Sequence, residues 1–93
     1  MAHHDAIRAV RDEAARAQGR YGDFHSTHEA LGVLCEEFDE LRAAIHGNSP
    51  VTIATEATQV AAVAMRLADL CYRAVTARDQ DIGADAFAAR SGF

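Results

Sequence analysis

No tryptophan occurs among the 93 residues, and the sequence has two cysteines, one proline and no apolar run approaching the roughly 20 residues of a membrane span. Two cysteines exclude a disulfide framework as the main source of stability, and we expect neither a helical membrane span nor a membrane partner. A chain of this length buries only about 60% of the surface that its unfolded form exposes, so its core is small. With neither disulfides nor aromatic bulk to compensate, we expect a single domain that self-associates.

Positive charge is also scarce, since nine Lys and Arg stand against fourteen Asp and Glu, a formal net charge of −5. Nucleic acid polymers are bound by clusters of Lys and Arg, so we expect no such partner. An acidic protein can still bind nucleotides when divalent cations lie between its carboxylates and the phosphates. No basic segment followed by an apolar stretch opens the sequence, so we expect a cytoplasmic protein. We expect Cys35 and Cys71 to be reduced thiols in its core.

Apolar residues recur at the spacing of an α-helix in three segments, and no segment shows the alternation of a strand. The first predicted helix covers about residues 5–18, and Gly19 and Gly22 are expected to end it. The second begins at a capping box, in which the Ser26 hydroxyl caps the amide of Glu29 while Glu29 reaches back, and continues to about His46. Its predicted apolar stripe comprises Leu31, Leu34, Phe38, Leu41 and Ile45.

The third predicted helix has Ser49 as its N-cap and Pro50 as its first residue, and it runs to about Arg78. Several alanines on its apolar stripe would let another helix approach closely. Beyond Arg78 we expect a short C-terminal segment, either helical or loose. The fold class is therefore predicted to be all-α: a helical bundle of three main helices plus a short C-terminal segment, in one domain over residues 1–93.

A run of acidic residues on the second predicted helix is the first candidate site. A helix turns about 100° per residue, so Glu37 and Glu40 project within about 60° of each other at the edge of the apolar face. Glu36 and Asp39 point further toward water. Glutamate is a strong helix former and charge runs are usually solvated faces, so this run alone leaves a structural role and a cation site both open.

Glu56 is more informative, because it falls inside the apolar arc of the third predicted helix. An isolated buried carboxylate costs several kcal/mol, so it needs a partner. Arg8 or Arg42 could supply that partner as a buried ion pair. Alternatively, Glu56 could share a Mg²⁺ ion with Glu37 and Glu40, because Mg²⁺ takes carboxylate oxygens together with waters and substrate phosphates.

Three basic residues are candidates for contacting those phosphates. Arg66 and Arg73 continue along the third predicted helix the line that Gln59 begins, at the flank of Glu56. His28 lies at the start of the second predicted helix. If the carboxylates hold a metal, we expect these three side chains to bind the substrate.

The acidic motifs together resemble a known family. The stretch from His28 to Leu41, which contains Glu36-Glu37-Phe38-Asp39-Glu40, resembles the helix carrying the E-E-x-x-E motif of the MazG-like, all-α nucleoside triphosphate pyrophosphohydrolases. Residues 56–66 resemble the second motif helix of that family, most closely in its short phage-type members. The likeness covers about residues 24–78, the core of the predicted domain.

This resemblance implies Mg²⁺-dependent hydrolysis of nucleoside or deoxynucleoside triphosphates to a monophosphate and pyrophosphate, with Mn²⁺ as an alternative ion. It implies Glu37, Glu40 and Glu56 as metal ligands, and Glu36 as a further ligand or as the base that orients the attacking water. It also implies assembly as a tight dimer or a dimer of dimers, that is, a homodimer or homotetramer.

Gln59 departs from the family's second motif, which is usually E-x-x-D. An amide can ligate Mg²⁺ through its carbonyl oxygen, so Gln59 stays in the predicted metal set, but one negative charge is missing. One alternative is therefore a catalytically weak or inactive relative that serves as a binding or assembly module. A second alternative is a zinc site built from the five histidines, although no Cys/His spacing, His25-x-x-His28 included, forms a recognisable one.

Overall fold

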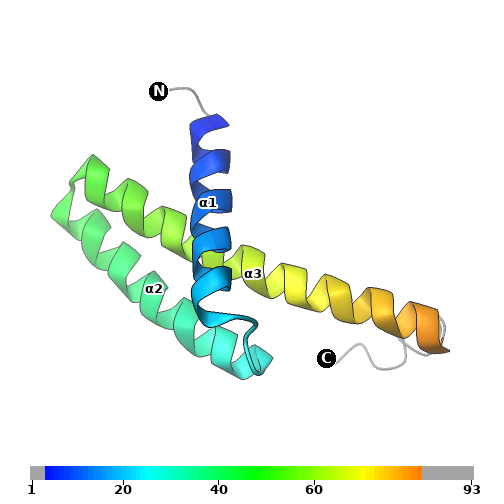
Figure 1. The fold of residues 1–93 in the computed structure, drawn as a ribbon. Coiled ribbons are helices and arrows are strands. Elements are labelled where there is room, and N and C mark those ends of the chain that lie inside the picture. Colours follow the sequence, from blue (N-terminus) through cyan, green and yellow to red (C-terminus); the bar gives the residue numbers. More distant parts are fainter. Residues whose placement is uncertain (1–3, 83–93) are drawn as a thin grey trace.

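The computed structural model describes residues 4–82 and contains only helices within that range (Figure 1). α1 spans His4–Tyr21, α2 spans Thr27–Gly47 and α3 spans Pro50–Ile82. α2 and the first half of α3 form an antiparallel pair, and α1 crosses the middle of α3. The all-α prediction with three main helices is confirmed. α3 continues to Ile82, past its predicted end at about Arg78, and the rest of the predicted C-terminal segment lies outside the described residues.

The membrane prediction can be compared with the helices themselves. Across residues 4–82, no helix combines the length and the apolar content that crossing a membrane requires.

The end of α1 lies later than the sequence indicated. The helix continues through Gly19, the first of the two glycines expected to end it, and stops at Tyr21, three residues past the predicted boundary at Gln18. Glycine inside a helix costs only about 1 kcal/mol relative to alanine, which the packing of α1 on α3 outweighs. Gly22, the second of these glycines, ends the helix, because its φ of 73° lies in the left-handed region while its N–H donates to the Gln18 carbonyl over 2.9 Å.

The predicted capping box at the start of α2 is confirmed, with one difference. The Ser26 hydroxyl accepts a hydrogen bond from the Glu29 amide over 3.0 Å. The Glu29 carboxylate reaches back to the amide of His25 over 2.9 Å, one residue before the cap. Glu29 therefore joins the first turn of α2 to the preceding loop.

The turn between α2 and α3 also follows its sequence. Asn48 adopts a φ of 61° and donates its N–H to the Ala44 carbonyl over 3.0 Å, which closes α2. Ser49 then accepts from the Thr52 amide over 3.5 Å, and Pro50 is the first residue of α3, as predicted. This short connection makes α2 and α3 antiparallel neighbours, and their facing side chains form the site.

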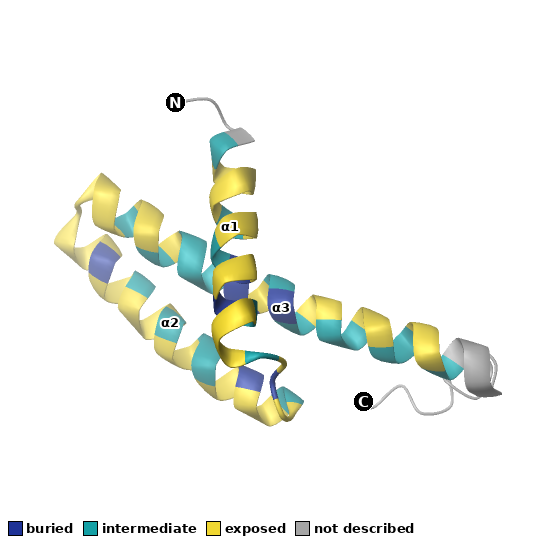
Figure 2. Ribbon diagram, viewed as in Figure 1, coloured by how far each residue is buried: buried dark blue, intermediate teal, exposed yellow. Residues whose placement is uncertain are grey.

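The core is small and rich in alanine. Figure 2 shows buried residues where α1 crosses α3, with isolated ones on α2 and in the loop before it. The buried apolar residues are Ala14, Ala17, Phe24, Ala30, Ala44, Ala62 and Val63. The radius of gyration is 15.8 Å, whereas a compact chain of this length has about 12 Å. One copy of the chain therefore leaves much apolar surface uncovered.

The predicted stripe of α2 is confirmed only in part: Leu34 and Leu41 are half-buried, and Leu34 packs against the core. Leu31, Phe38 and Ile45 are 54%, 55% and 52% exposed, whereas Ala30 and Ala44 are buried against α3. Small side chains let the two helix backbones approach closely, which larger residues at the contact would prevent. The helix is therefore turned so that its alanines face α3. Leu31, Phe38 and Ile45 recur every seven residues, and we call them the α2 stripe.

The cysteine prediction was wrong for one of the two thiols. Cys35 is exposed and Cys71 is half-buried. Cys35 lies beside the α2 stripe, where it lines a pocket together with Phe38 and with Val60 of α3. Both thiols are free, as expected.

Candidate functional site

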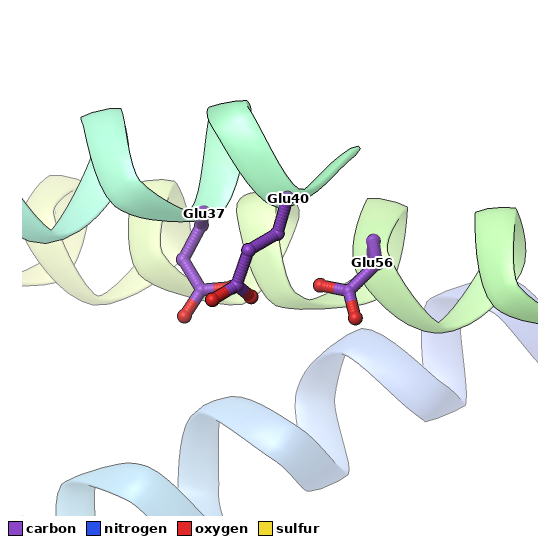
Figure 3. Close-up of side chains that lie close together, drawn as sticks. All are labelled: Glu37, Glu40 and Glu56. Carbon is purple, nitrogen blue, oxygen red and sulfur yellow. The ribbon is translucent and has the colours of Figure 1, made fainter. Parts of the chain in front are cut away.

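Three glutamates from two helices converge between α2 and α3. Glu37 and Glu40 extend from α2 and Glu56 from α3, and Figure 3 shows their side chains directed into the same space. One carboxylate oxygen of each lies within 4.8 Å of the others. Within residues 4–82, no other group of three or more His, Cys, Asp or Glu is arranged this closely. We call these residues the carboxylate cluster.

Local sequence explains the convergence. Glu37 and Glu40 are three residues apart on one helix, so they project in similar directions. Glu56 lies on the facing helix, and the turn at Asn48 and Ser49 brings it opposite them. Oxygens bound to one octahedral Mg²⁺ at about 2.1 Å lie roughly 3–4 Å apart. Small side-chain movements would therefore bring the carboxylate cluster to that spacing.

The carboxylate cluster is electrostatically unsatisfied. One oxygen of Glu37 and one oxygen of Glu56 are buried with no hydrogen-bond partner among the described residues. Burial raises the pKa of Glu37, and the charges of Glu40 and Glu56 raise it further. Burial also raises the pKa of Glu56, followed by the hydrogen bond and charge of Glu40. Each effect disfavours the ionised carboxylates, and a bound cation would reverse it.

The ion-pair alternative for Glu56 is not what the structure shows. Arg42 forms an ion pair with Asp39 on its own helix. None of the ion pairs found among the described residues involves Glu56. Glu56 instead faces two further acids. Its burial in the apolar arc is therefore explained by a shared acidic site and not by an arginine.

A pocket of about 480 Å³ adjoins the carboxylate cluster. It lies between α1, the loop before α2, and the facing sides of α2 and α3, and Glu37 belongs to both the pocket and the carboxylate cluster. Its apolar lining includes Ala17, Phe24, Val33, Ala62 and Val63. We call it the α1 pocket.

No family model, curated protein or solved structure matches this chain. Function is therefore inferred from the side chains of the site.

Arg66 lies in the wall of the α1 pocket and is only 8% exposed. Its guanidinium donates to the Gln18 side-chain oxygen over 3.3 Å and to the Gly22 carbonyl over 3.0 Å. It also lies 4.4 Å from the ring centre of Phe24. These contacts fix the end of α1 and the following loop to α3.

Arg73, the second predicted phosphate contact, is engaged at the same junction. It forms two bonds to the Asp23 carboxylate, of 2.9 and 3.1 Å. Arg73 lowers the pKa of Asp23, and Gln18 lowers it further by hydrogen bonding. Arg73 lies two turns beyond Arg66 on α3, away from the carboxylate cluster. Its partner is Asp23, in the loop between α1 and α2.

The remaining predicted residues lie around the carboxylate cluster without joining it. Gln59 is half-buried and lines the α1 pocket, outside the group of three. Glu36 is exposed on α2, and its charge contributes to the raised pKa of Glu37. His28 is exposed in the first turn of α2 and does not line the α1 pocket. Of the predicted metal ligands, the structure therefore brings Glu37, Glu40 and Glu56 together and leaves Gln59 outside the group.

Glu13 is the residue that sequence reasoning missed. It lies on α1, lines the α1 pocket with Gln59, and has a side chain only 16% exposed. A signal was present, because Val10, Glu13 and Ala17 follow the i, i+3, i+7 spacing of the buried face of α1. A carboxylate on an apolar arc singled out Glu56, and the same criterion would have found Glu13.

Proposed function

We propose that the protein is a Mg²⁺-dependent pyrophosphohydrolase of nucleoside or deoxynucleoside triphosphates. The observation that carries the proposal is the convergence of Glu37, Glu40 and Glu56 from two helices, with two buried oxygens lacking hydrogen bonds. A solvated run of acids would not place unpaired oxygens inside the protein. A divalent cation is the partner that this arrangement suits.

The donor set supports Mg²⁺, with Mn²⁺ as an alternative. All three side chains offer carboxylate oxygens, which hard cations prefer, and no histidine or cysteine joins the group. Three protein ligands leave positions for waters and substrate phosphates. An ion held there would neutralise phosphate charge and make a bound water more acidic.

The reaction class rests on the motif spacing. Glu36, Glu37 and Glu40, followed by Glu56 on the next helix, resemble the acidic motifs of the MazG-like pyrophosphohydrolases. In the proposed reaction a water oxygen bonds to the α-phosphorus and the bond to the bridging oxygen breaks, which releases pyrophosphate. Glu36 would orient this water and take its proton, a role that its exposed position beside Glu37 permits.

Assembly as a homodimer or a homotetramer is part of the proposal. The α2 stripe exposes more than half of each of three large apolar side chains, and one copy forms little core. An apolar surface of this kind on a small protein marks an interface. A second copy of the chain would cover it, and the stripe lies on the same helix as Glu37 and Glu40.

Product analysis tests the function. The protein is incubated with ribo- and deoxynucleoside triphosphates and Mg²⁺ or Mn²⁺, and the products are separated by anion exchange. We expect monophosphate and pyrophosphate from the wild type and no products from Glu37→Gln. Asp69→Asn is the matched control, because it removes an exposed carboxylate of α3 outside the carboxylate cluster, and it should retain activity.

Three other results would count against the proposal. Release of inorganic phosphate with a diphosphate would contradict cleavage at the α–β bond. Full activity in Glu37→Gln would contradict the assignment of the site. No turnover with either ion, combined with retained cation binding, would favour a catalytically inactive binding module.

A further inference from the structure

The side of the α2–α3 pair that faces away from α1 is apolar on both helices. On α2 it carries the α2 stripe. On α3 it carries five alanines at alternating three- and four-residue spacings, which we call the α3 alanine face: Ala54, Ala57, Ala61, Ala64 and Ala68. Four of these alanines are exposed and Ala61 is half-buried. None of the five lines either of the pockets that α1 borders, so α1 leaves this side of α3 uncovered.

A pocket of about 540 Å³ lies on this side, between the two helices. Its lining residues are Leu34, Cys35, Phe38, Asp39 and Val60. Neither α1 nor a member of the carboxylate cluster contributes to this lining. The one charged residue of the lining, Asp39, forms an ion pair with Arg42. The pocket is therefore a mostly apolar hollow, separate from the carboxylate cluster, with its charge neutralised at the edge.

The first half of α3 is nearly free of charge. Between Pro50 and Met65 the sequence has one charged residue, Glu56, which points into the carboxylate cluster. A helix side that is solvated in the native protein usually carries charged residues. The small side chains of the α3 alanine face also allow a second helix to approach closely. These features indicate a side of α3 that another helix covers.

The exposed area of the chain exceeds that of a compact monomer. The chain exposes 6618 Å², whereas a compact monomer of 10.0 kDa exposes about 5200 Å². The excess of about 1400 Å² is larger than the roughly 800 Å² that each partner of a standard interface buries, and it lies in the range of obligate homodimers. One partner of the chain's own size is therefore sufficient to cover it.

The α2 stripe and the α3 alanine face are complementary to each other. Leu31, Phe38 and Ile45 recur every seven residues, and so do Ala57 and Ala64. Seven residues are about two helix turns, so the large side chains of one α2 meet small side chains of a second copy's α3 at every repeat. In a two-fold pair this contact forms twice, which closes the assembly. A second copy is thus the occupant that the chain's own residues match.

Contact with both helices also affects the carboxylate cluster. Glu37 and Glu40 extend from α2 and Glu56 from α3, so without a cation their repulsion acts between the two helices. A second copy that contacts α2 and α3 together opposes that repulsion by holding the helices at their native spacing. A bound cation removes the repulsion itself. Both partners therefore favour the same arrangement of α2 and α3.

We propose that a second copy of the chain binds across the α2 stripe and the α3 alanine face, and that this assembly and cation binding at the carboxylate cluster strengthen each other. The inference rests on the proposed function, from which it takes the cation and the homodimer. Coupling between two binding events is reciprocal, so each lowers the dissociation constant of the other by the same factor. The dimer therefore binds Mg²⁺ more tightly than the monomer does.

A substitution on α3 tests the surface. Ala64→Arg places a charge at the proposed contact without removing a core side chain, and it should shift the mass measured by light scattering toward the monomer. Thr55→Arg is the matched control, because Thr55 is exposed and lies half a turn around α3 from Ala64. This control should keep the wild-type mass. A wild-type mass for Ala64→Arg would contradict the surface, and a monomeric wild type would overturn the inference.

Cys35 supplies a second readout of the same contact. Its thiol is exposed in one copy and lines the pocket between α2 and α3, so a second copy should cover it. With Cys71 replaced by Ser, Cys35 should react with a thiol reagent several-fold more slowly than it does when Ala64→Arg is also present. Equal rates in the two proteins would contradict docking at this pocket.

The dissociation constant of the dimer tests the coupling. It is measured by sedimentation in EDTA and in saturating Mg²⁺. We expect Mg²⁺ to lower it by about fivefold or more in the wild type and in Asp69→Asn, and to leave it unchanged in Glu56→Gln, which lacks one acid of the carboxylate cluster. In calorimetry, Ala64→Arg should need a Mg²⁺ concentration higher by the same factor for half-saturation.

The outcomes separate this inference from the proposed function. Binding of Mg²⁺ by calorimetry with an unchanged dissociation constant of the dimer would contradict the coupling and leave the proposed cation site intact. Absence of Mg²⁺ binding would contradict both the proposed function and the coupling. In that case a monomeric Ala64→Arg beside a dimeric Thr55→Arg would still support the contact surface.

Discussion

Carboxylate oxygens of Glu37 on α2 and Glu56 on α3 lie within 4.8 Å of each other, and each residue has one buried oxygen with no hydrogen-bond partner among the described residues. Their pKa values are both raised, with burial as the first cause. Like charges held this close destabilise the metal-free protein. The arrangement is thus costly by itself and favourable once a cation is bound, which makes it testable through stability.

Neutralising one acid of the carboxylate cluster should stabilise the metal-free protein. We expect Glu56→Gln, measured in EDTA at neutral pH, to melt a few degrees higher than the wild type, because it removes repulsion with Glu37 and Glu40 while keeping a similar shape. Asp69→Asn should melt within about one degree of the wild type, as exposed substitutions usually do. A lower melting temperature for Glu56→Gln would show that the ionised carboxylate is stabilised by the protein alone.

The pH dependence of stability should show two separate windows. Glu37 and Glu56 have raised pKa values, so their contribution is present below the unfolded value of 4.5 and is lost as the pH rises through the folded values. Glu13 and Glu29 have lowered pKa values, so their contribution is present above 4.5 and is lost as the pH falls through the folded values. In EDTA the melting temperature should therefore decline as the pH is raised above about 4.5.

The variant Glu56→Gln tests whether Glu56 causes the loss of stability above about pH 4.5. Its melting temperature should decline less between pH 4.5 and neutrality, whereas the loss at more acidic pH should match the wild type. Saturating Mg²⁺ should abolish the decline in the wild type, because the cation binds the deprotonated carboxylates. A decline of equal size in both proteins would assign the effect to other groups.

Arg66 should be the most sensitive basic residue for stability. Replacing it by Leu leaves the Gly22 carbonyl and the Gln18 oxygen without their donor and removes the contact with the Phe24 ring. We expect a loss of about 2–4 kcal/mol in the free energy of unfolding, measured with urea. Arg20→Leu is the control, because Arg20 is exposed and lies 5.5 Å from the Tyr21 ring centre. A loss below 1 kcal/mol for Arg66→Leu would show that the junction is held by apolar contacts.

Two glycines near the end of α1 should respond in opposite directions to alanine. Gly19 lies inside the helix with open space around an added Cβ, so Gly19→Ala should stabilise by up to about 1 kcal/mol. Gly22 has equal space but a φ of +73°, so Gly22→Ala should destabilise by about 1–2 kcal/mol. Urea unfolding of both variants checks this. Stabilisation by both would show that the α1 terminus has another conformation in solution.

The α2 stripe should control the oligomeric state. We expect the wild type to have the mass of a dimer or tetramer by light scattering, and Phe38→Glu to shift it toward the monomer, because a charge in an apolar contact is unfavourable. Val51→Glu is the control, since Val51 is 78% exposed and lies outside the stripe. A monomeric wild type, or a Phe38→Glu variant with unchanged mass, would contradict assembly through this surface.

The sequence predicted what depends on local chemistry. Ser26, Ser49 and Pro50 carry recognisable helix-start signals, and the structure places each at its helix start. The three-residue spacing of Glu37 and Glu40 fixes their shared direction on any helix, so that pair could also be predicted. Glu56 could be singled out because a carboxylate on an apolar arc is costly whatever faces it.

Other features depend on how the helices pack, which periodicity alone does not determine. Ala30 and Ala44 of α2 are buried together with half-buried Val33, Leu34 and Leu41, whereas Leu31, Phe38, Ile45 and Cys35 lie on the exposed side of the helix. The partners of Arg66 lie on α1 and in the loop that follows it, so a helical-wheel projection of α3 alone could not reveal them. Glu13 was missed for the same reason, since the predicted site was confined to the two motif helices.

Divalent cation binding tests the central claim most directly. The melting temperature is measured while Mg²⁺ is titrated into metal-free wild type, Glu56→Gln and Asp69→Asn. At about 100 times the dissociation constant, binding to the native state adds about 2.7 kcal/mol, which raises the melting temperature of a chain this size by on the order of 10 °C. We predict this rise for the wild type and Asp69→Asn and its absence in Glu56→Gln. Equal curves for all three proteins, or no rise in the wild type, would contradict a metal site at Glu37, Glu40 and Glu56.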